Sequence, residues 1–225
     1  KPEEKVDARR VMELLRSTYE GTEMDVTRNI KTVNRDGDTI VSPIANPWMG
    51  GNDINTYNMI APGTVDAKRT VSVSWCSYSF VTQLRSWMPN EIGGICWFSV
   101  ENPGQSPRIP IFTGSTKLPS CFDECGHYNY NEESLLWRYR KANKLAQIQW
   151  GSTKKTMIDN VLRYEEKAMK EIPALEEEVK ALLEEGKKEE AQQLLNRYTS
   201  DFEAATANTW KEMEQSFWER FWVNF

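Results

Sequence analysis

The sequence predicts an α+β fold in which a mixed segment precedes a long helical region. Three stretches rich in β-branched and aromatic residues, at 68–85, 93–100 and 108–114, predict an antiparallel three-stranded meander. From Asn131 onward the composition changes to helix formers, with Glu and Lys spaced for i,i+4 pairs. The 225 residues are therefore expected to divide into an α+β part, residues 1–130, and a helical part, residues 131–225, that packs on it.

The N-terminal part of the chain is expected to hold one helix and a long loop. Residues 3–20 carry apolar side chains near helical spacing, which predicts an amphipathic helix that Gly21 ends. Residues 34–63 are rich in Gly, Asn, Asp and Pro, and this composition predicts a long, structured loop region. Because long loops inside compact domains are often functional, this segment is a candidate for a binding role.

The helical region is expected to begin near Asn131, because Asn is a favourable N-cap residue. Residues 153–172 continue as helix. Pro173 predicts a break or the first turn of a new helix, because proline lacks a backbone N–H. The rest, about residues 174–222, predicts a helical hairpin with its turn at Gly186.

Composition and motifs argue against several classes of function. The net charge is −5, and no run of Lys and Arg interleaves with aromatic residues, so a nucleic-acid partner is not expected. No apolar run approaches the roughly 20 residues that span a bilayer. The sequence has no Gly-rich phosphate loop, no serine nucleophile elbow and no His-Glu-x-x-His helix. We therefore expect no cofactor and no membrane span.

The chain has four cysteines and one histidine, which suggests a Cys76–His127 dyad as one catalytic hypothesis. A nucleophilic cysteine needs a depressed pKa, from a base, a cation or a helix N-terminus. We expect Cys76 in the middle of the strand over 68–85, where such activation is unusual. A buried structural cysteine is the favoured alternative, because free cysteine is among the most buried residue types.

A metal site is a second hypothesis for the cysteines. Cys121, Cys125 and His127 lie within seven residues and are metal-ligand types. No second pair of ligands follows, so Cys96 or Cys76 would have to complete the site. A disulfide in an oxidising compartment is a further alternative. Unpaired structural cysteines are favoured over both, and the sequence predicts no metal.

Four segments together resemble a known enzyme family. They are "ARRVMELLRSTYEGTEMDVT" at 8–27, "NPWMG" at 46–50, the strand-rich stretch from "RTVSVSWCSYSF" to "RIPIFTG" at 69–114, and "LLWRYRKANKLAQ" at 135–147. In this order they are similar to the C-terminal part of the bacterial dipeptidase A (PepD-type) family. The resemblance covers most of residues 8–150, and the order is more specific than any single motif.

This resemblance implies an N-terminal-nucleophile (Ntn) hydrolase, whose fold is an αββα sandwich of two stacked antiparallel sheets between helices. It implies a catalytic cysteine that becomes the first residue of the mature chain. The thiolate attacks a peptide carbonyl, the free α-amino group of the cysteine is the base, and water hydrolyses the acyl-enzyme. Such an enzyme needs no partner histidine, no metal and no cofactor.

The sequence departs from this family pattern at its start. Residue 1 is Lys, and the first cysteine is Cys76. The resemblance therefore implies that the nucleophile lies upstream and that no catalytic residue is in this chain. We expect this chain to be inactive alone, with the N-terminal half of the same protein and a dipeptide or short peptide as its partners.

Four residues are candidates for substrate binding. Enzymes of this superfamily use an Arg and polar groups near the thiol to orient the substrate and stabilise the oxyanion. Arg69, Gln83 and Arg85 flank the central strand, and Asn46 lies in the "NPWMG" loop. The alternative is that both arginines are surface charges at strand ends and that Asn46 caps a turn.

A non-catalytic binding or assembly module is the alternative function. Its partner surface would be the helical hairpin at 174–222, which ends with Phe217, Trp218, Phe221 and Trp222 close together. Such an aromatic stripe at helical spacing is more often part of a core. A homo-oligomer is a further expectation for partners, whereas the sequence leaves the cellular compartment open.

Overall fold

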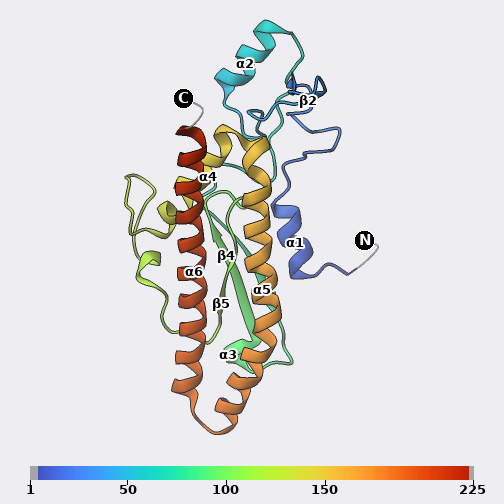
Figure 1. The fold of residues 1–225 in the computed structure, drawn as a ribbon. Coiled ribbons are helices and arrows are strands. Elements are labelled where there is room, and N and C mark those ends of the chain that lie inside the picture. The colour runs from blue at the N-terminus through green and yellow to red at the C-terminus, as the bar shows by residue number, and fades with distance from the viewer. Residues whose placement is uncertain (1–4, 223–225) are drawn as a thin grey trace.

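The computed structural model describes residues 5–222 and shows an α+β fold. A three-stranded antiparallel sheet lies against a hairpin of two long helices, α5 (Trp150–Glu184) and α6 (Lys188–Trp222), as Figure 1 shows. The predicted fold class is confirmed. The hydrophobic core is continuous between the sheet and the helices, so the two parts of the chain share it. The division at residue 130 stays a prediction.

The sheet is the predicted meander, with the strand order β3-β4-β5. Strand β3 (Tyr78–Leu84) pairs antiparallel with β4 (Gly94–Val100), which pairs antiparallel with β5 (Ile109–Phe112). A short helix, α3 (Asn90–Gly93), leads into β4. The strand predicted over 68–85 was too long, because it begins only at Tyr78.

One face of the sheet packs against the long helices. Val81, Ile95, Trp97 and Phe112 point to this side and are buried in the core. Thr199 of α6 donates a hydrogen bond to the Pro110 carbonyl of β5, at 2.8 Å, in the same interface. The long helices thus cover this face of the sheet together with the N-terminal helix, whose Met12 is fully buried in the same core.

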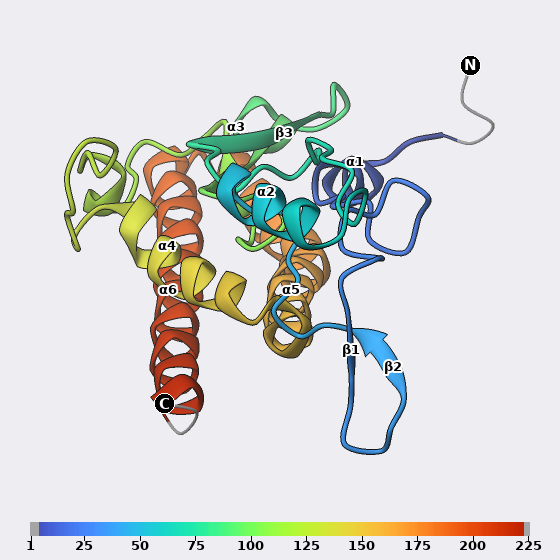
Figure 2. The same cartoon turned by 90° about the horizontal axis from the view of Figure 1, so that it is seen from above.

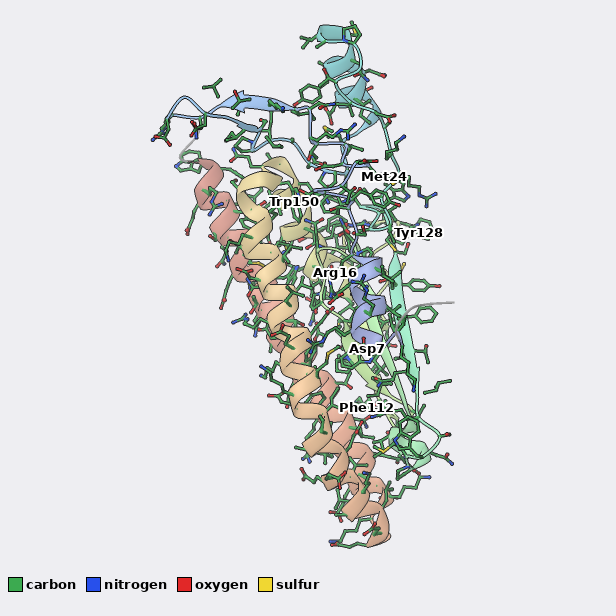
Figure 3. The ribbon with its side chains drawn as sticks, turned by 90° about the vertical axis from the view of Figure 1, so that its right-hand side faces the viewer. Asp7, Arg16, Met24, Phe112, Tyr128 and Trp150 are labelled. Atoms are coloured by element: carbon green, nitrogen blue, oxygen red, sulfur yellow. The ribbon has the colours of Figure 1, made fainter. Side chains whose placement is uncertain are left out.

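The opposite face of the sheet carries the exposed side chains of Tyr78, Phe80 and Leu84 and the half-buried Phe98, and we call it the aromatic face. Tyr78 is 57% exposed and Leu84 is 75% exposed. The ring of Tyr78 stacks on Phe98, with centroids 5.9 Å apart, and on Phe80, with centroids 6.4 Å apart. Figure 3 shows both long helices on one side of the sheet. Within residues 5–222, no helix or second sheet buries the aromatic face.

The N-terminal helix is shorter than predicted. Helix α1 (Ala8–Leu15) begins at Asp7, whose carboxylate accepts from the Arg10 N–H at 2.8 Å. It ends before Arg16, whose guanidinium reaches Glu165 of α5 at 2.6 Å. Gly21 has a φ of +79°, so it occupies a turn beyond the helix rather than its end. Residues 3 and 4 of the predicted helix lie outside the described residues.

The expected loop over 34–63 contains regular structure, so that prediction was wrong. Strand β2 (Thr39–Val41) pairs with β1 (Lys31–Val33) through a turn in which Gly37 has a φ of +88°. Helix α2 (Gly51–Ile60) follows the "NPWMG" loop. The β1–β2 hairpin and α2 lie at one end of the molecule, at the top of Figure 1. The Gly, Asn, Asp and Pro residues of 34–63 therefore form the turns between a short strand and a short helix, not one long loop.

The helical region begins after a 3₁₀ turn, η1 (Ser120–Phe122), and an irregular loop. Helix α4 (Leu135–Ile148) starts three residues later than the Asn131 cap would give, because the Ser134 side chain caps it instead. Helix α5 follows almost at once. Figure 2 shows α4 crossing between the long helices.

Pro173 does not break the helix, in contrast to the prediction. It lies inside α5, which runs for 35 residues. Ile172 and Leu175 beside it are buried in the core, and this packing offsets the roughly 3 kcal/mol that a helix-interior proline costs. The hairpin therefore begins at Trp150 rather than 174. Its turn at Gly186, with a φ of +75°, is as predicted.

No helix among the described residues combines the length and apolar character that a bilayer crossing requires.

A buried ion pair joins the sheet to the helices at the end of β3. The Arg85 guanidinium lies 2.6 Å from the Glu176 carboxylate of α5, and both side chains are largely buried. Arg85 also donates to the Ile92 carbonyl at 2.6 Å. This pair fixes α5 against the strand end.

Replacing Arg85 with Met should therefore destabilise the fold strongly, because Glu176 would keep a buried charge without a counterion. We expect a loss of about 3–5 kcal/mol in the free energy of unfolding, measured by urea denaturation. The double variant with Glu176→Leu should lose less. As a control, Lys167→Met removes the exposed Lys167–Glu171 pair and should cost less than about 1 kcal/mol. Equal losses for Arg85→Met and the control would contradict this.

Candidate functional site

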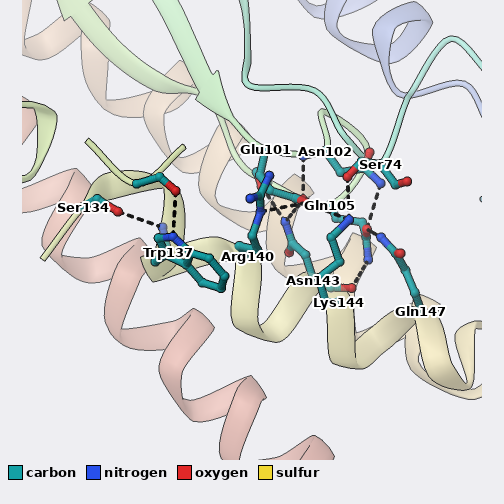
Figure 4. A network of polar contacts seen from close by, with 12 residues as sticks. Ser74, Glu101, Asn102, Gln105, Ser134, Trp137, Arg140, Asn143, Lys144 and Gln147 are labelled. Atoms are coloured by element: carbon teal, nitrogen blue, oxygen red, sulfur yellow. Dashed lines mark hydrogen bonds and ion pairs between the residues drawn. The ribbon is translucent and has the colours of Figure 1, made fainter. Parts of the chain in front are cut away.

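A buried polar network occupies the turn that follows β4, where the sheet meets α4 (Figure 4). Buried polar groups must find hydrogen-bond partners, so such a cluster fixes the backbone segments around it. We call it the Glu101 network, and its members are Ser72, Ser74, Glu101, Asn102, Gln105, Ser106, Arg140, Asn143, Lys144 and Gln147.

Glu101 is the centre of this network. Its side chain is fully buried, and its backbone has a φ of +62°, which is rare for a residue with a Cβ. Its Oε2 accepts from the Asn102 N–H at 2.6 Å and from Asn143 Nδ2 at 2.8 Å. Its Oε1 lies 3.1 Å from Lys144 Nζ and 3.8 Å from Arg140 Nε. Two cations of α4 thus balance one buried carboxylate.

The turn and the helix are joined by further hydrogen bonds. Gln105 donates to the Asn143 carbonyl at 3.0 Å, and Gln147 donates to Gln105 Oε1 at 2.7 Å. Trp210 of α6 donates to Asn143 Oδ1 at 2.9 Å. The network therefore connects the sheet to both α4 and α6.

The same network holds the irregular segment 69–77 in place. Ser72 Oγ donates to Asn102 Oδ1 at 2.5 Å, and Lys144 Nζ donates to the Ser74 carbonyl at 2.5 Å. A Cβ placed on Gly104 would lie 2.5 Å from Ser72 Oγ, so only glycine allows this close approach. The backbone groups of Ser72 and Ser74 are bonded to the Ser17 carbonyl, Trp48 and Lys144 rather than to a neighbouring strand, which explains why this segment is not part of β3.

The "NPWMG" loop contacts this segment directly. Trp48 Nε1 donates to the Ser72 carbonyl at 2.5 Å. Asn46 accepts from the Trp48 N–H at 2.9 Å and donates to the Gln147 carbonyl of α4 at 3.2 Å. Asn46 is half-buried and lines a groove between α2 and the end of α4. The loop that carries the "NPWMG" motif thus lies beside the Glu101 network.

Arg69 begins the segment 69–77 and is exposed. Its guanidinium lies over the ring of Trp75, 5.9 Å from the centroid. This contact is a weak cation–π interaction at a solvent-exposed site. Asn46 and Arg69 are therefore found at the same end of the sheet, where β3 begins.

Gln83 and Arg85 lie at the opposite end of β3, about 20 Å away for a strand of this length. Gln83 Oε1 accepts from the indole N–H of the buried Trp97 at 3.2 Å. Arg85 is held by Glu176, as described above. The structure thus separates the four candidates into two pairs, and the second pair has partners within the protein. A substrate role for any of the four stays a prediction.

Cys76 does not lie in the middle of a strand, as was predicted, but just before β3. Its thiol donates to the Tyr78 carbonyl at 3.0 Å. Burial raises the pKa of this thiol, and the negative charge of Glu101 raises it further. None of the hydrogen bonds found within residues 5–222 joins it to His127, whose ring contacts Tyr128. This environment opposes thiolate formation, so it is the reverse of what a nucleophile needs.

The other cysteines do not gather into a metal site. Cys121 is buried, whereas Cys125 is exposed. Across the described part of the chain, no group of three or more His, Cys, Asp or Glu side chains could hold a metal ion. The four cysteines are free thiols in this structure.

The model of peptidase family C69 matches residues 1–163 of the chain, from the N-terminal helix to the first turns of α5. This is well over half of the sequence. The chain belongs to peptidase family C69. The resemblance to the dipeptidase A (PepD-type) family is thereby confirmed, and membership supports a peptidase, hence a hydrolase, function. No curated protein matches the sequence.

The sequence interpretation did not identify the centre of the site, Glu101 and its partners on α4. Glu101 stood in "ENPGQSP", which was interpreted only as a turn. A signal was present in the helix: Arg140, Asn143, Lys144 and Gln147 are spaced i, i+3, i+4 and i+7. This spacing places four polar side chains on one helix face, next to apolar positions.

Glu101→Gln tests the network. The change keeps the shape of the side chain but removes the charge that balances Lys144 and Arg140. Because both cations retain some solvent contact, we expect a loss of about 2–3 kcal/mol in the free energy of unfolding by urea denaturation. Glu133→Gln on the surface is the control and should change stability by less than about 0.5 kcal/mol. A similar loss of unfolding free energy in both variants would show that the charge of Glu101 does not stabilise the fold.

The buried thiol of Cys121 predicts a pH dependence of stability. Burial, aided by Glu203, raises the pKa of this thiol to about 12. Above about pH 9 the unfolded chain ionises this group and the folded chain does not, so its contribution to stability falls as pH rises through this range.

The free energy lost by Cys121→Ala should therefore shrink between pH 8 and pH 10, by about 1 kcal/mol. Urea denaturation at the two pH values measures it. Cys125→Ala, at an exposed position, should show no such change. A loss for Cys121→Ala that is independent of pH would contradict the assignment.

Proposed function

We propose that this chain is the C-terminal portion of a cysteine-type dipeptidase that hydrolyses short peptides. The nucleophile is the N-terminal cysteine of an upstream portion of the same protein. Its thiolate attacks the scissile carbonyl, its own α-amino group is the base, and water releases the acyl group. This chain contributes part of the fold and of the substrate site and is inactive alone.

The observation that carries this proposal is family membership combined with the state of Cys76. A C69 peptidase of the cysteine type requires an activated thiol, whereas burial and Glu101 disfavour the thiolate of Cys76. Cys121 is more deeply buried, and its pKa is raised further. These environments support a nucleophile outside the described chain.

The aromatic face supports a second sheet supplied by the upstream portion. Stacked sheets bury apolar side chains between them at a spacing of about 10 Å, and Tyr78, Phe80 and Leu84 are the kind of surface that such packing covers. β3 is also an edge strand, and its sequence YSFVTQL has none of the charges or prolines that protect exposed edges. Both features fit half of an αββα sandwich.

Asn46 and Arg69 are the substrate-binding residues that this proposal favours. They lie at the same end of the sheet, where Trp48 and Ser72 connect Asn46 to the Glu101 network and the Arg69 guanidinium lies over Trp75. Arg69 has an exposed guanidinium that could pair with a substrate carboxylate. Gln83 and Arg85 are less suitable, because Trp97 and Glu176 already occupy their polar groups.

The test compares this chain alone with the protein encoded by the full reading frame, using a panel of dipeptides. We expect hydrolysis by the full-length protein and none by the chain alone. Replacing the first cysteine of the mature upstream portion with Ala should abolish activity, because the thiolate is lost. Cys76→Ala in the full-length protein is the matched control and should retain activity.

An active isolated chain whose activity is lost in Cys76→Ala would contradict the proposal. It would make Cys76 the nucleophile. A full reading frame that encodes no upstream cysteine able to become N-terminal would contradict it equally.

The assembly module remains the alternative, and one observation favours it. Trp218 and Trp222, one helical turn apart on α6, are 57% and 80% exposed. Phe217 and Phe221 beside them are buried in the core. Exposed tryptophans are enriched at protein interfaces, so this pair suits a contact with another protein or with a second copy of this chain. The buried pair, however, is already explained by the fold.

A further inference from the structure

We propose that the groove between α2 and the end of α4 binds the amino-terminal end of the peptide substrate, with Asp53 as the partner of its free α-ammonium group. This inference rests on the proposed peptidase function and deepens it. Dipeptides carry a free amino end, and the inference assigns the residue that recognises it.

The groove has a size and character that suit a short peptide. Its volume is about 430 Å³, within the range of small-ligand sites. Its lining mixes apolar side chains, such as Ile44, Met49 and Ile148, with the polar groups of Asn46, Asp53, Thr56 and Gln147. A groove that combines apolar contact surface with convergent polar groups is typical of sites that recognise small molecules.

Asp53 gives the groove its charge. It is the sole charged residue among those that line the groove. Its Oδ2 accepts from the Gly50 N–H at 3.2 Å, which fixes the side chain at the start of α2. None of the ion pairs found within residues 5–222 involves it. Asp53 is exposed, and its carboxylate, held by Gly50 and without a cationic partner among these ion pairs, is complementary to a ligand ammonium group.

Asn46 can hold the peptide unit that follows the ammonium group. Its Nδ2 donates once, to the Gln147 carbonyl, and its Oδ1 accepts once, from the Trp48 N–H. An amide has two donor hydrogens and two acceptor positions, so one of each is left after these bonds. The bonds to Gln147 and Trp48 hold the amide in place. Asn46 can therefore bind a substrate carbonyl or N–H while Asp53 pairs with the amino end.

Apolar side chains complete the recognition of a peptide terminus. Ile44, Met49 and Ile148 offer contact surface without hydrogen-bonding demands. Such a surface accepts many side chains with little discrimination, because one methylene more or less changes binding only modestly. The groove would therefore select peptides with a free amino group and accept many different side chains beside it.

The test measures how strongly the full-length enzyme prefers a free amino group. A dipeptide and its N-acetylated form compete separately against a fluorogenic substrate, and the two inhibition constants are compared. The wild type should bind the free dipeptide at least ten times more tightly. Asp53→Asn should bring this ratio close to one, by weakening the free dipeptide 10–100-fold and leaving the acetylated form unchanged.

Two matched variants separate this role from a structural one. Asp36→Asn changes an exposed carboxylate of the β1–β2 turn and should keep the wild-type ratio. Asp53→Glu restores the charge and should recover part of the preference. If Asp53 only capped α2, its loss would weaken both peptides equally.

A wild-type ratio near one would overturn the inference, as would an unchanged ratio in Asp53→Asn or an equal weakening of both peptides. A full-length protein that hydrolyses no peptide would instead overturn the proposed function. The two failures are therefore distinguishable.

Discussion

The rest of this structure depends on one buried carboxylate, that of Glu101. It lies where the sheet, α4 and the irregular segment 69–77 meet, and its charge is balanced by Lys144 and Arg140. A buried charge needs donors and counterions: Asn143 and the Asn102 N–H donate to Oε2, whereas Oε1 accepts no hydrogen bond from the described residues and faces the two cations. The left-handed backbone at Glu101 adds a local cost, which the surrounding contacts must offset.

The network explains how a segment without regular structure can be held in one conformation. Segment 69–77 lacks strand partners, yet Asn102, Lys144 and Trp48 hold its backbone and hydroxyl groups at fixed points. The "NPWMG" loop is connected to the same points. Catalytic and binding residues are commonly carried on loops that a rigid scaffold positions, and here the scaffold is α4 together with the sheet. The "NPWMG" loop and the Glu101 network thus lie together at the end of the sheet where β3 begins.

Much of the architecture followed from local sequence, and the errors have physical causes. Runs of β-branched residues gave the meander, and Gly186 gave the hairpin turn, because both signals are local. Pro173 was misjudged because core contacts of Ile172 and Leu175 outweigh a local preference. The start of β3 was misplaced because polar groups distant in sequence satisfy residues 69–77. The position of Asp53 in a groove could not be predicted either, because α2 and α4 meet only in the folded chain.

The aromatic face has a consequence for how such a protein is made and handled. The stacked rings of Tyr78, Phe80 and Phe98 lie next to the edge strand β3, which has no protecting charge or proline. Such a surface tends to associate with other apolar surfaces in water. While that surface is uncovered, a higher protein concentration favours aggregates over the monomer. Chaperones that bind exposed apolar surface would also bind this face. Any segment or partner that covers this face would have to reach it before the exposed rings meet those of another molecule, so the yield of monomer should fall as the concentration of folding chains rises.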